Sequence, residues 1–513
     1  MTEKDAEQIR GEYVSLGILL LLLVVGRLLQ YYLSGFANDD GYITFRYARN
    51  IAEGNGFVYN LGERVLGTTT PLWTILLSVS ALLFGSVNIP AASVTLSVAA
   101  DIAIVVVLWR IGRKASPMAR ILPVLLFLLY PKVILICGSG MEASLVVALM
   151  VGAFAFFTME RHQTAAFVLG LLLLTRFDGA IWSIVLLGWL WVQHKSFPWK
   201  ELLVIASVVL PWLVFSQFYF GSVIPHSLIA KSVSYSHLFP VFDPLRVLTG
   251  YLPFESLRVS SIVVRLPFVL LMLVPVGIEL IRLWRRRSSF VVWPAFFLLY
   301  ALTFSFARVI LHDWYYLPGF VSYFVTCSTF AEHLFSQVAF ARKEFTWWAN
   351  GLALVAFAAF FVVIAFRFES NVGTPFENEY GDLARYFRDK SKSSIFIEPI
   401  GYAGWLSDSY IHDPVGIVSP DVVAYRLTYP GSDQWWMSFV KASLPDYVVL
   451  RMAEVKQNTL YLGHGENLFS DEAKKEWFKE NYGEVSWPNR TAINFFVFRK
   501  KPASTTDLAA AGQ

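Results

Sequence analysis

The stretch ANDDGYITFRYARNIAEG, residues 37–54, follows the first long apolar run of the chain and carries two adjacent carboxylates, Asp39 and Asp40. Over residues 42–53 the polar side chains recur at helical spacing, which predicts an amphipathic helix at a membrane interface. One of the carboxylates can cap this helix. Since a cap needs only one of them and neighbouring carboxylates repel each other, the pair indicates a base, a metal site or a cationic substrate.

The composition is that of a polytopic membrane protein. Of the 513 residues, 56% are hydrophobic and 16% are charged, and the mean hydropathy is +0.53; a soluble enzyme would have about a quarter of its residues charged. The net charge of +4 does not indicate a nucleic-acid partner, because Lys and Arg cluster in short loops, where they set membrane topology. Cys137 and Cys327 both lie in apolar segments, so neither a disulfide framework nor a cysteine metal site is expected.

Apolar runs that approach the ~20 residues of a membrane-spanning helix predict about eleven such helices, the first of them retained rather than cleaved as a signal peptide. The run 71–85 is ambiguous in length. With the basic loops and the N-terminus inside, this run is expected to lie along the membrane surface or to re-enter it without crossing. The predicted spans lie at 14–34, 91–109, 120–137, 143–159, 164–175, 179–193, 201–220, 262–281, 290–306, 316–334 and 346–366.

This topology puts the first outer loop, 35–90, on the outer side of the membrane. Residues 1–367 are expected to form a transmembrane module, residues 368–500 a small extracytoplasmic α/β domain, and residues 501–513 a disordered tail. Within the outer domain, short strands are predicted at 395–400, 446–450 and 494–498 and a polar helix at 471–482.

The longer stretch DDGYITFRYARNIAEGNGFVYNLGERVLGTTTPLWTILL (39–77) resembles the first outer loop of the GT-C glycosyltransferases, most closely their mycobacterial arabinofuranosyltransferase-like branch. The resemblance touches most of the chain, strongly in its first third and loosely after residue 320. This chain has Phe177 where members more often have Pro, and His226 where they more often have Asn. The other segments that agree in order are SGMEASL (139–145), LTRFDGAIW (174–182), YFGSVIPHSLIAKS (219–232), HDWYYLP (312–318), IGYAGWLSDSYIHDPVGIVSP (400–420) and PDYVVL (445–450).

The resemblance implies a GT-C type fold, a polytopic α-helical membrane protein with interfacial helices in the first outer loop. It also implies a glycosyltransferase of the bacterial inner membrane, which moves a sugar from a polyprenyl-phosphate donor to a glycan or glycolipid acceptor of the cell envelope on the outer face. The sugar is left open between arabinofuranosyl and mannosyl types. A need for Mg²⁺ or Mn²⁺ is open as well.

Asp39 and Asp40 match the acidic pair of the family, in which one carboxylate deprotonates the acceptor hydroxyl. The chemistry agrees, because a sugar hydroxyl has a very high pKa and needs a base as the new bond forms. We expect Asp39 to be this base, since it stands further from the helix start, and Asp40 to act as helper, cap or metal ligand. Glu142 could assist them or hold a metal; alternatively, its spacing from Ser139 marks a capping box.

Further residues are candidates for substrate binding, and each has a structural alternative. Lys231 and Arg308 could hold the lipid phosphate or extend to lipid headgroups. Arg176 and Asp178 could orient the donor or acceptor, or form an ion pair at a helix end. All the substrate-binding candidates except Arg46 and His226 are expected to meet the acidic residues in one cavity at the outer membrane edge. The full set is Arg46, Arg176, Asp178, His226, Lys231, Arg308 and His312.

Some polar and aromatic residues are expected to be structural. Asp101, in the middle of a predicted span, must find a polar partner. Tyr402 and Trp405 are expected to pack in the core of the outer domain rather than to stack against a sugar.

Two other functions stay open at this point. A secondary transporter would place paired charges and broken helices at the bilayer midplane, usually in repeated halves. A membrane sensor would use the outer domain to bind a ligand, but would leave the loop carboxylates unexplained.

Overall fold

The computed structural model describes residues 3–34, 38–112, 117–252, 262–336, 375–390, 392–430, 434–451, 472–486 and 495–502. The predicted span 346–366, the predicted boundary near residue 368 and the tail after residue 502 lie outside these described residues.

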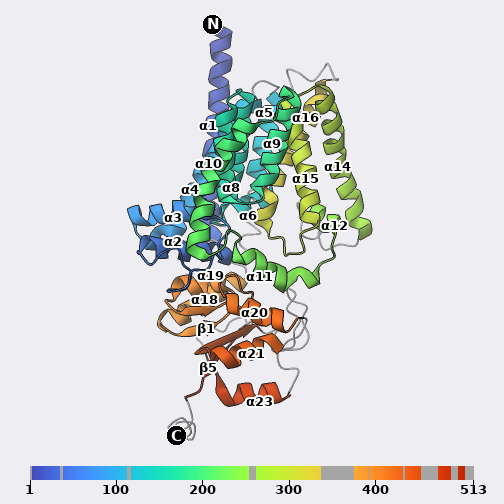
Figure 1. Cartoon of the computed structure of the whole chain (residues 1–513). Helices are drawn as coiled ribbons and strands as arrows, with labels where there is room; N and C mark the ends of the chain where they lie inside the picture. The colour runs from blue at the N-terminus through green and yellow to red at the C-terminus, as the bar shows by residue number, and fades with distance from the viewer. Residues whose placement is uncertain are drawn as a thin grey trace.

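A bundle of apolar helices forms the body of the molecule, and the N-terminus lies at one end of it (Figure 1). Four described helices are long and apolar enough to cross a membrane, or five if a bent pair forms one span. Five shorter apolar helices have 10–17 residues. The chain is therefore a multi-pass membrane protein. The bundle helices are α1 (Glu3–Ser34), α4 (Ile89–Gly112), α5 (Pro117–Leu129), α6 (Pro131–Cys137), α7 (Ala143–Thr158), α8 (His162–Thr175), α9 (Gly179–His194), α10 (Trp199–Phe220), α14 (Ile262–Arg285), α15 (Val292–Ser305) and α16 (Leu317–Ser336).

Each predicted span within the described residues coincides with a bundle helix, except that the run 120–137 is not one helix. It is divided into α5 and α6, which are bent by 69° at the break. Tyr130 precedes Pro131 and has an extended backbone (φ −72°, ψ 121°), because the proline ring disfavours the helical conformation in the residue before it. The prediction of a single helix there was wrong, and the count of eleven spans stays a prediction.

Two helices of the first loop, α2 (Asp39–Ala52) and α3 (Pro71–Phe84), pack against each other at the end of the bundle away from the N-terminus (Figure 1). The sequence predicts α2 as an interfacial helix, but its polar face is enclosed by protein. Arg46 and Asn50 are each only 3% exposed. Arg46 Nη2 donates to the Ser409 carbonyl, and Asn50 Nδ2 donates to the Val58 carbonyl. Backbone carbonyls of the protein therefore bind polar side chains that were expected to meet water and headgroups.

The C-terminal part contains a five-stranded sheet in the order β2-β1-β3-β5-β4, beyond the end of the bundle that carries α2 (Figure 1). β1 pairs in parallel with β2 and β3, whereas β5 pairs antiparallel with β3 and β4. β3 and β5 coincide with the predicted strands and α23 with the predicted polar helix, whereas β1 covers only the first two residues of the strand predicted at 395–400, whose last residue begins α19. The elements are α18 (Pro375–Arg388), β1 (Ser394–Phe396), α19 (Ile400–Leu406), β2 (Tyr410–His412), α20 (Pro420–Thr428), α21 (Gln434–Ser443), β3 (Tyr447–Arg451), α23 (Glu472–Asn481), β4 (Tyr482–Val485) and β5 (Phe495–Lys500).

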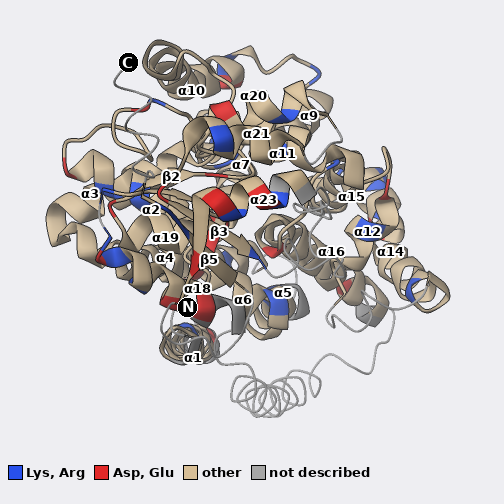
Figure 2. Cartoon of the chain, turned by 90° about the horizontal axis from the view of Figure 1, so that it is seen from below, with Lys and Arg blue, Asp and Glu red and all other residues tan. Residues whose placement is uncertain are grey.

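Alternate side chains of the sheet enter two different cores, as the period of two in a strand requires. Ile395 and Val449 face a cluster shared with α18 and with Tyr47 and Tyr59 of the first loop. The strand residues that alternate with these two, such as Val448, face a second cluster with α21 and α23. Side chains of the first loop therefore form part of the hydrophobic core on one face of the sheet. Seen from the sheet end, α23 and β5 lie in front of the bundle, whose ribbons carry few charged residues (Figure 2).

Arg27 and Asp101 form a charged pair inside the bundle. Arg27 Nε donates to Asp101 Oδ2 at 2.7 Å, and the two side chains are 4% and 0% exposed. This confirms the expectation that Asp101 makes a structural polar contact.

Candidate active site

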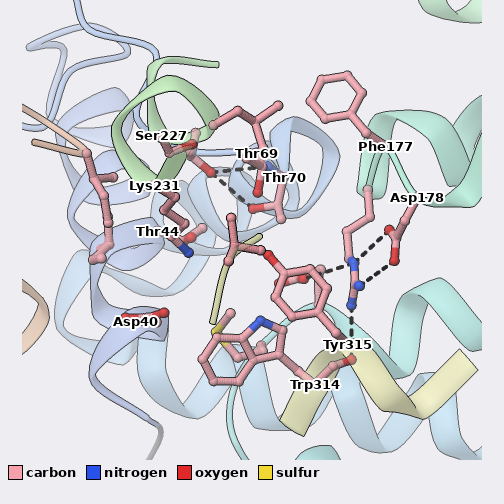
Figure 3. A pocket seen from close by; sticks show the side chains of 18 of the residues that line it. Asp40, Thr44, Thr69, Thr70, Phe177, Asp178, Ser227, Lys231, Trp314 and Tyr315 are labelled. Carbon is pink, nitrogen blue, oxygen red and sulfur yellow. Dashed lines mark hydrogen bonds and ion pairs between the residues drawn. The ribbon is translucent and has the colours of Figure 1, made fainter. Parts of the chain in front are cut away.

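A cavity of about 330 Å³ lies where the first loop, the bundle and the C-terminal part meet. Segments far apart in the sequence contribute to it, among them α2, α11 (His226–Tyr235) and the loops at the ends of α8 and α15. Figure 3 shows several of these side chains around the open space. The lining residues are Asp40, Ile43, Thr44, Gly67, Thr68, Thr69, Thr70, Met141, Glu142, Arg176, Phe177, Asp178, Ser227, Leu228, Lys231, Phe304, Ala307, Val309, Trp314, Tyr315 and Ile417.

The two adjacent carboxylates have different surroundings. Asp39 is 8% exposed, and its carboxylate accepts hydrogen bonds from the backbone N–H groups of Gly401 (3.0 Å) and Tyr402 (2.7 Å). It therefore caps α19 of the C-terminal part, and it is not among the cavity-lining residues. Burial raises the pKa of Asp39 to about 7, although the two N–H donors oppose this shift.

Asp40, by contrast, is half-buried and lines the cavity. Neither carboxylate caps α2, which begins after Asn38 without a side-chain cap bond. Within the described part of the chain, the carboxylate of Asp40 has no hydrogen bond or ion pair to another side chain. Asp39, the expected base, is thus hydrogen-bonded to α19, whereas its neighbour Asp40 lines the cavity. The assignment of the base within the pair stays a prediction.

A second group of charges forms the opposite side of the cavity. Arg176 donates to both carboxylate oxygens of Asp178, at 3.0 and 2.5 Å, and to the Trp314 carbonyl at 3.1 Å. The Tyr300 hydroxyl donates to Asp178 at 2.7 Å. Arg176 and Asp178 therefore form the ion pair that the sequence allows, and this pair is part of the cavity wall.

Glu142, at the residue before α7, joins this group. It is 3% exposed, and its Oε1 lies 3.8 Å from Arg176 Nε. The residue directly precedes α7 and makes no side-chain cap bond, so the capping-box alternative with Ser139 is wrong. Burial raises the pKa of Glu142, and Arg176 opposes this only in part.

Lys231 supplies a cation on α11. It lines the cavity, and no hydrogen bond or ion pair joins its ammonium group to any side chain that the structure describes. Burial opposes its charge, but Tyr315 and the carboxylates of Asp40 and Asp413 together raise the pKa of Lys231. Such a cation beside a cavity is suited to an anionic ligand.

Other predicted site residues lie outside the cavity lining. Arg46 is bound to the Ser409 carbonyl and stacks over Tyr59. His226 begins α11, and its backbone N–H donates to the Leu66 carbonyl. Arg308 is exposed, and its Nε donates to the Phe239 carbonyl.

His312 lies behind the lining residue Trp314. The two rings stack at a centroid distance of 4.5 Å, with 3° between their planes. Burial lowers the pKa of His312, and the negative charge of Asp40 opposes this shift, so the imidazole is within electrostatic reach of the cavity without lining it.

The aromatic residues of α19 pack in the core. Tyr402 and Trp405 contact Tyr42 at centroid distances of 4.4 and 6.1 Å, and Arg49 lies over the Trp405 ring. This confirms core packing for both.

Sequence reasoning missed the hydroxyl-bearing residues of the cavity. Thr44, Thr68, Thr69, Thr70 and Ser227 all line it. The run GTTTP at 67–71 was part of the quoted motif, but threonine alone is too common in turns to single out. Among the described residues, no three His, Cys, Asp or Glu side chains are grouped so that they could hold a metal ion, so no ligand set is assigned for Mg²⁺ or Mn²⁺.

Comparison with known proteins supports the fold. Residues 370–501 match a family model described as a domain of unknown function, DUF8728. Over 219 residues the chain is 27% identical to the terminal beta-(1->2)-arabinofuranosyltransferase of Mycobacterium tuberculosis, an alignment that covers 38% of this chain and 35% of that protein. The chain therefore matches about a third of the length of this curated relative.

Two crystal structures of ArnT from Cupriavidus metallidurans are similar over nearly the whole chain. The form bound to undecaprenyl phosphate has a TM-score of 0.59 at 11% identity and covers 95% of this chain and 98% of that one. The apo form has a TM-score of 0.57 at 12% identity and covers 94% and 98%. The chain therefore has the GT-C fold, as its sequence predicts.

Proposed function

We propose that this chain, a multi-pass membrane protein with the GT-C fold, is a glycosyltransferase that moves a sugar from a polyprenyl-phosphate donor to an acceptor hydroxyl, with Asp40 as the general base. The observation that carries the proposal is one cavity holding a carboxylate, Asp40, and an ammonium group, Lys231, neither of which is neutralised by a bonded partner in the described residues. The similarity to an arabinofuranosyltransferase and to a fold that binds undecaprenyl phosphate supports it.

The geometry suggests how the reaction would proceed. Asp40 takes the proton of the acceptor hydroxyl as the hydroxyl oxygen bonds to the anomeric carbon of the donor. The bond between that carbon and the phosphate oxygen breaks, and the phosphate leaves with the electron pair. Lys231 stabilises the charge that develops on the phosphate, and Arg176, held in place by Asp178, supports it from the other wall.

The cavity is also suited to a substrate with a lipid tail. Phe177 and Leu228 line it and are 38% and 47% exposed. A polyprenyl chain could pass over these apolar side chains and stay in the bilayer while its phosphate reaches Lys231.

The outer face of a bacterial inner membrane is the proposed location of the cavity. Asp178 lines it at the start of α9, whose other end is followed by Lys195. Phe304 lines it near the end of α15, and Arg285 precedes the start of that helix. The basic loops thus lie at the opposite end of the bundle and favour that end as cytoplasmic. The C-terminal part would then be extracytoplasmic and the acceptor an envelope glycan or glycolipid.

The test is transfer in washed membranes supplied with radiolabelled polyprenyl-phospho-arabinofuranose or polyprenyl-phospho-mannose. Asp40→Asn keeps the size of the side chain but cannot take a proton, so turnover should fall by roughly 10²–10⁴. Asp39→Asn should retain far more activity, and Asp408→Asn, an exposed carboxylate of the C-terminal part, serves as the control. If Asp39→Asn abolishes transfer while Asp40→Asn spares it, Asp39 is the base; if both variants stay active, neither is. The alternatives of a transporter or a sensor gain no support from the comparisons, and both would leave the wild type without transfer.

A further inference from the structure

We infer that the hydroxyl-bearing wall of the cavity is the subsite for the transferred sugar, and that Ser227 binds one of its ring hydroxyls. This hydroxyl wall consists of Thr44, Thr68, Thr69, Thr70 and Ser227. The inference rests on the proposed function and deepens it, because it assigns the ligand of this wall as an uncharged sugar ring with free hydroxyl groups.

Ser227 carries the inference because its hydroxyl is buried and has no partner. The residue is 5% exposed and lines the cavity, and among the described residues its Oγ has no hydrogen-bond partner. A buried polar group left unpaired costs about 1–3 kcal/mol. A hydroxyl in that state beside an open cavity is best explained by a ligand that supplies the missing partner.

The position of Ser227 in its helix explains why it has no internal partner. It is the second residue of α11, so no preceding helical turn offers a carbonyl for its hydroxyl. Ser234, on the same helix and 0% exposed, is satisfied differently, because its Oγ donates to the Val415 carbonyl at 3.0 Å. Two buried serines of one helix thus differ in a way that burial alone does not explain.

Two threonines of the wall, Thr68 and Thr70, are held in place by hydrogen bonds to each other. The hydroxyls of Thr68 and Thr70 are 3.1 Å apart, and the Thr70 N–H donates to Thr68 Oγ1 at 3.2 Å. Both residues are 5% exposed or less. Each hydroxyl has one donor and two acceptor positions, so both keep capacity for a ligand. Groups held in position before binding lose little entropy when the ligand arrives.

The place of the wall fits a sugar attached to a phosphate. Ser227 and Lys231 are four residues apart on α11 and therefore lie on the same face, about 5–6 Å apart between their Cβ atoms. A phosphate at Lys231 would put the attached sugar beside Ser227 and the threonines. Figure 3 shows Thr69, Thr70 and Ser227 on the side of the cavity away from Asp178, so the ion pair of Arg176 and Asp178 does not compete for the same hydroxyls.

The experiment combines a residue change with removal of single hydroxyls from the donor. The donor is whichever of polyprenyl-phospho-arabinofuranose and polyprenyl-phospho-mannose the wild type accepts, compared with each of its monodeoxy analogues. Ser227→Ala should raise the KM for the full donor by about 2–13-fold, the equivalent of one neutral hydrogen bond of about 0.5–1.5 kcal/mol, and should leave kcat within about twofold. One deoxy analogue should lose affinity with the wild type but show no further loss with Ser227→Ala.

Ser232→Ala, an exposed serine on the same helix, is the matched control and should behave as the wild type with every analogue. An unchanged KM in Ser227→Ala, or a rise that is equal for the full donor and for every deoxy analogue, would overturn the inference and leave the proposed transferase intact. Absence of transfer by the wild type from either donor would overturn the proposed function and this inference with it.

Discussion

The contact between Asp39 and α19 determines how the C-terminal part is fixed to the first loop, and Gly401→Ala tests it. The N–H of Gly401 donates to Asp39 Oδ2, and a Cβ at position 401 would lie 1.8 Å from the Asp39 carbonyl oxygen and 2.6 Å from its carbonyl carbon. These are backbone atoms and cannot swing aside. An alanine must therefore push α2 and α19 apart.

The cost follows from the bonds that this separation breaks. Two hydrogen bonds to the charged carboxylate contribute about 1.5–3 kcal/mol each, so their loss should lower the free energy of unfolding by about 3–6 kcal/mol. Since burial raises the pKa of Asp39 to about 7, the full effect is expected at pH 8 or above, where the carboxylate is ionised. Asp40 follows directly in the chain, so the same displacement should also reduce transfer.

Gly381→Ala is the matched control. Gly381 is a buried helical glycine of α18, but a Cβ there would meet only the side chain of Arg385, at 3.5 Å. It should be neutral or stabilising, since alanine favours a helix over glycine by about 1 kcal/mol. Scanning calorimetry of the purified protein in detergent at pH 8 gives the comparison. A melting temperature of Gly401→Ala within about 1 °C of Gly381→Ala would refute the role assigned to this contact.

Two further predictions concern pH and topology. Burial raises the pKa of Asp39 to about 7 and that of Asp413 to about 6, from 3.8, so these two groups bind more protons in the native state than in the unfolded state. Their contribution to stability should be fully present below pH 3.8 and decline as the pH rises to about 7. Asp39→Asn should flatten this decline in melting temperature, and a profile parallel to that of the wild type would contradict it. For topology, cysteines replacing Ser196 in the α9–α10 loop and Ala442 in α21, in a background without the native cysteines, should react differently with an impermeant maleimide. In intact spheroplasts only the Ala442 position should be labelled, and labelling at Ser196 would reverse the orientation.

Local patterns in the sequence determine much of the fold. Helices over 91–109 and 201–220 follow from runs of apolar residues, because the length and hydropathy of such a run decide its structure without reference to the rest of the chain. The strands β1, β3 and β5 lie in short stretches rich in β-branched and aromatic residues, a local composition that favours strands. The break before Pro131 was missed, although the proline that causes it is visible, because the apolar run continues across it.

The partners of polar residues depend on contacts that no local pattern contains. Asp101 was expected to need a partner, but only the packing of α1 against α4 identifies Arg27. Arg46 was expected to bind substrate, and only the docking of the C-terminal part shows that it binds the Ser409 carbonyl. In both cases the charged side chain needs a polar partner, and the tertiary structure decides which group is that partner.

For Asp39 and Asp40, too, the sequence determines one part of the arrangement and the tertiary structure the other. The sequence determines that two carboxylates stand at the start of a helix, and since successive residues of a helix point about 100° apart, they must face different surroundings. Which of them faces the cavity depends on where α19 docks, and α19 lies more than 300 residues further along the chain. Its backbone N–H groups bind Asp39 and leave Asp40 to the cavity, because an N-terminal helix turn needs an acceptor and takes the carboxylate that the packing brings within reach.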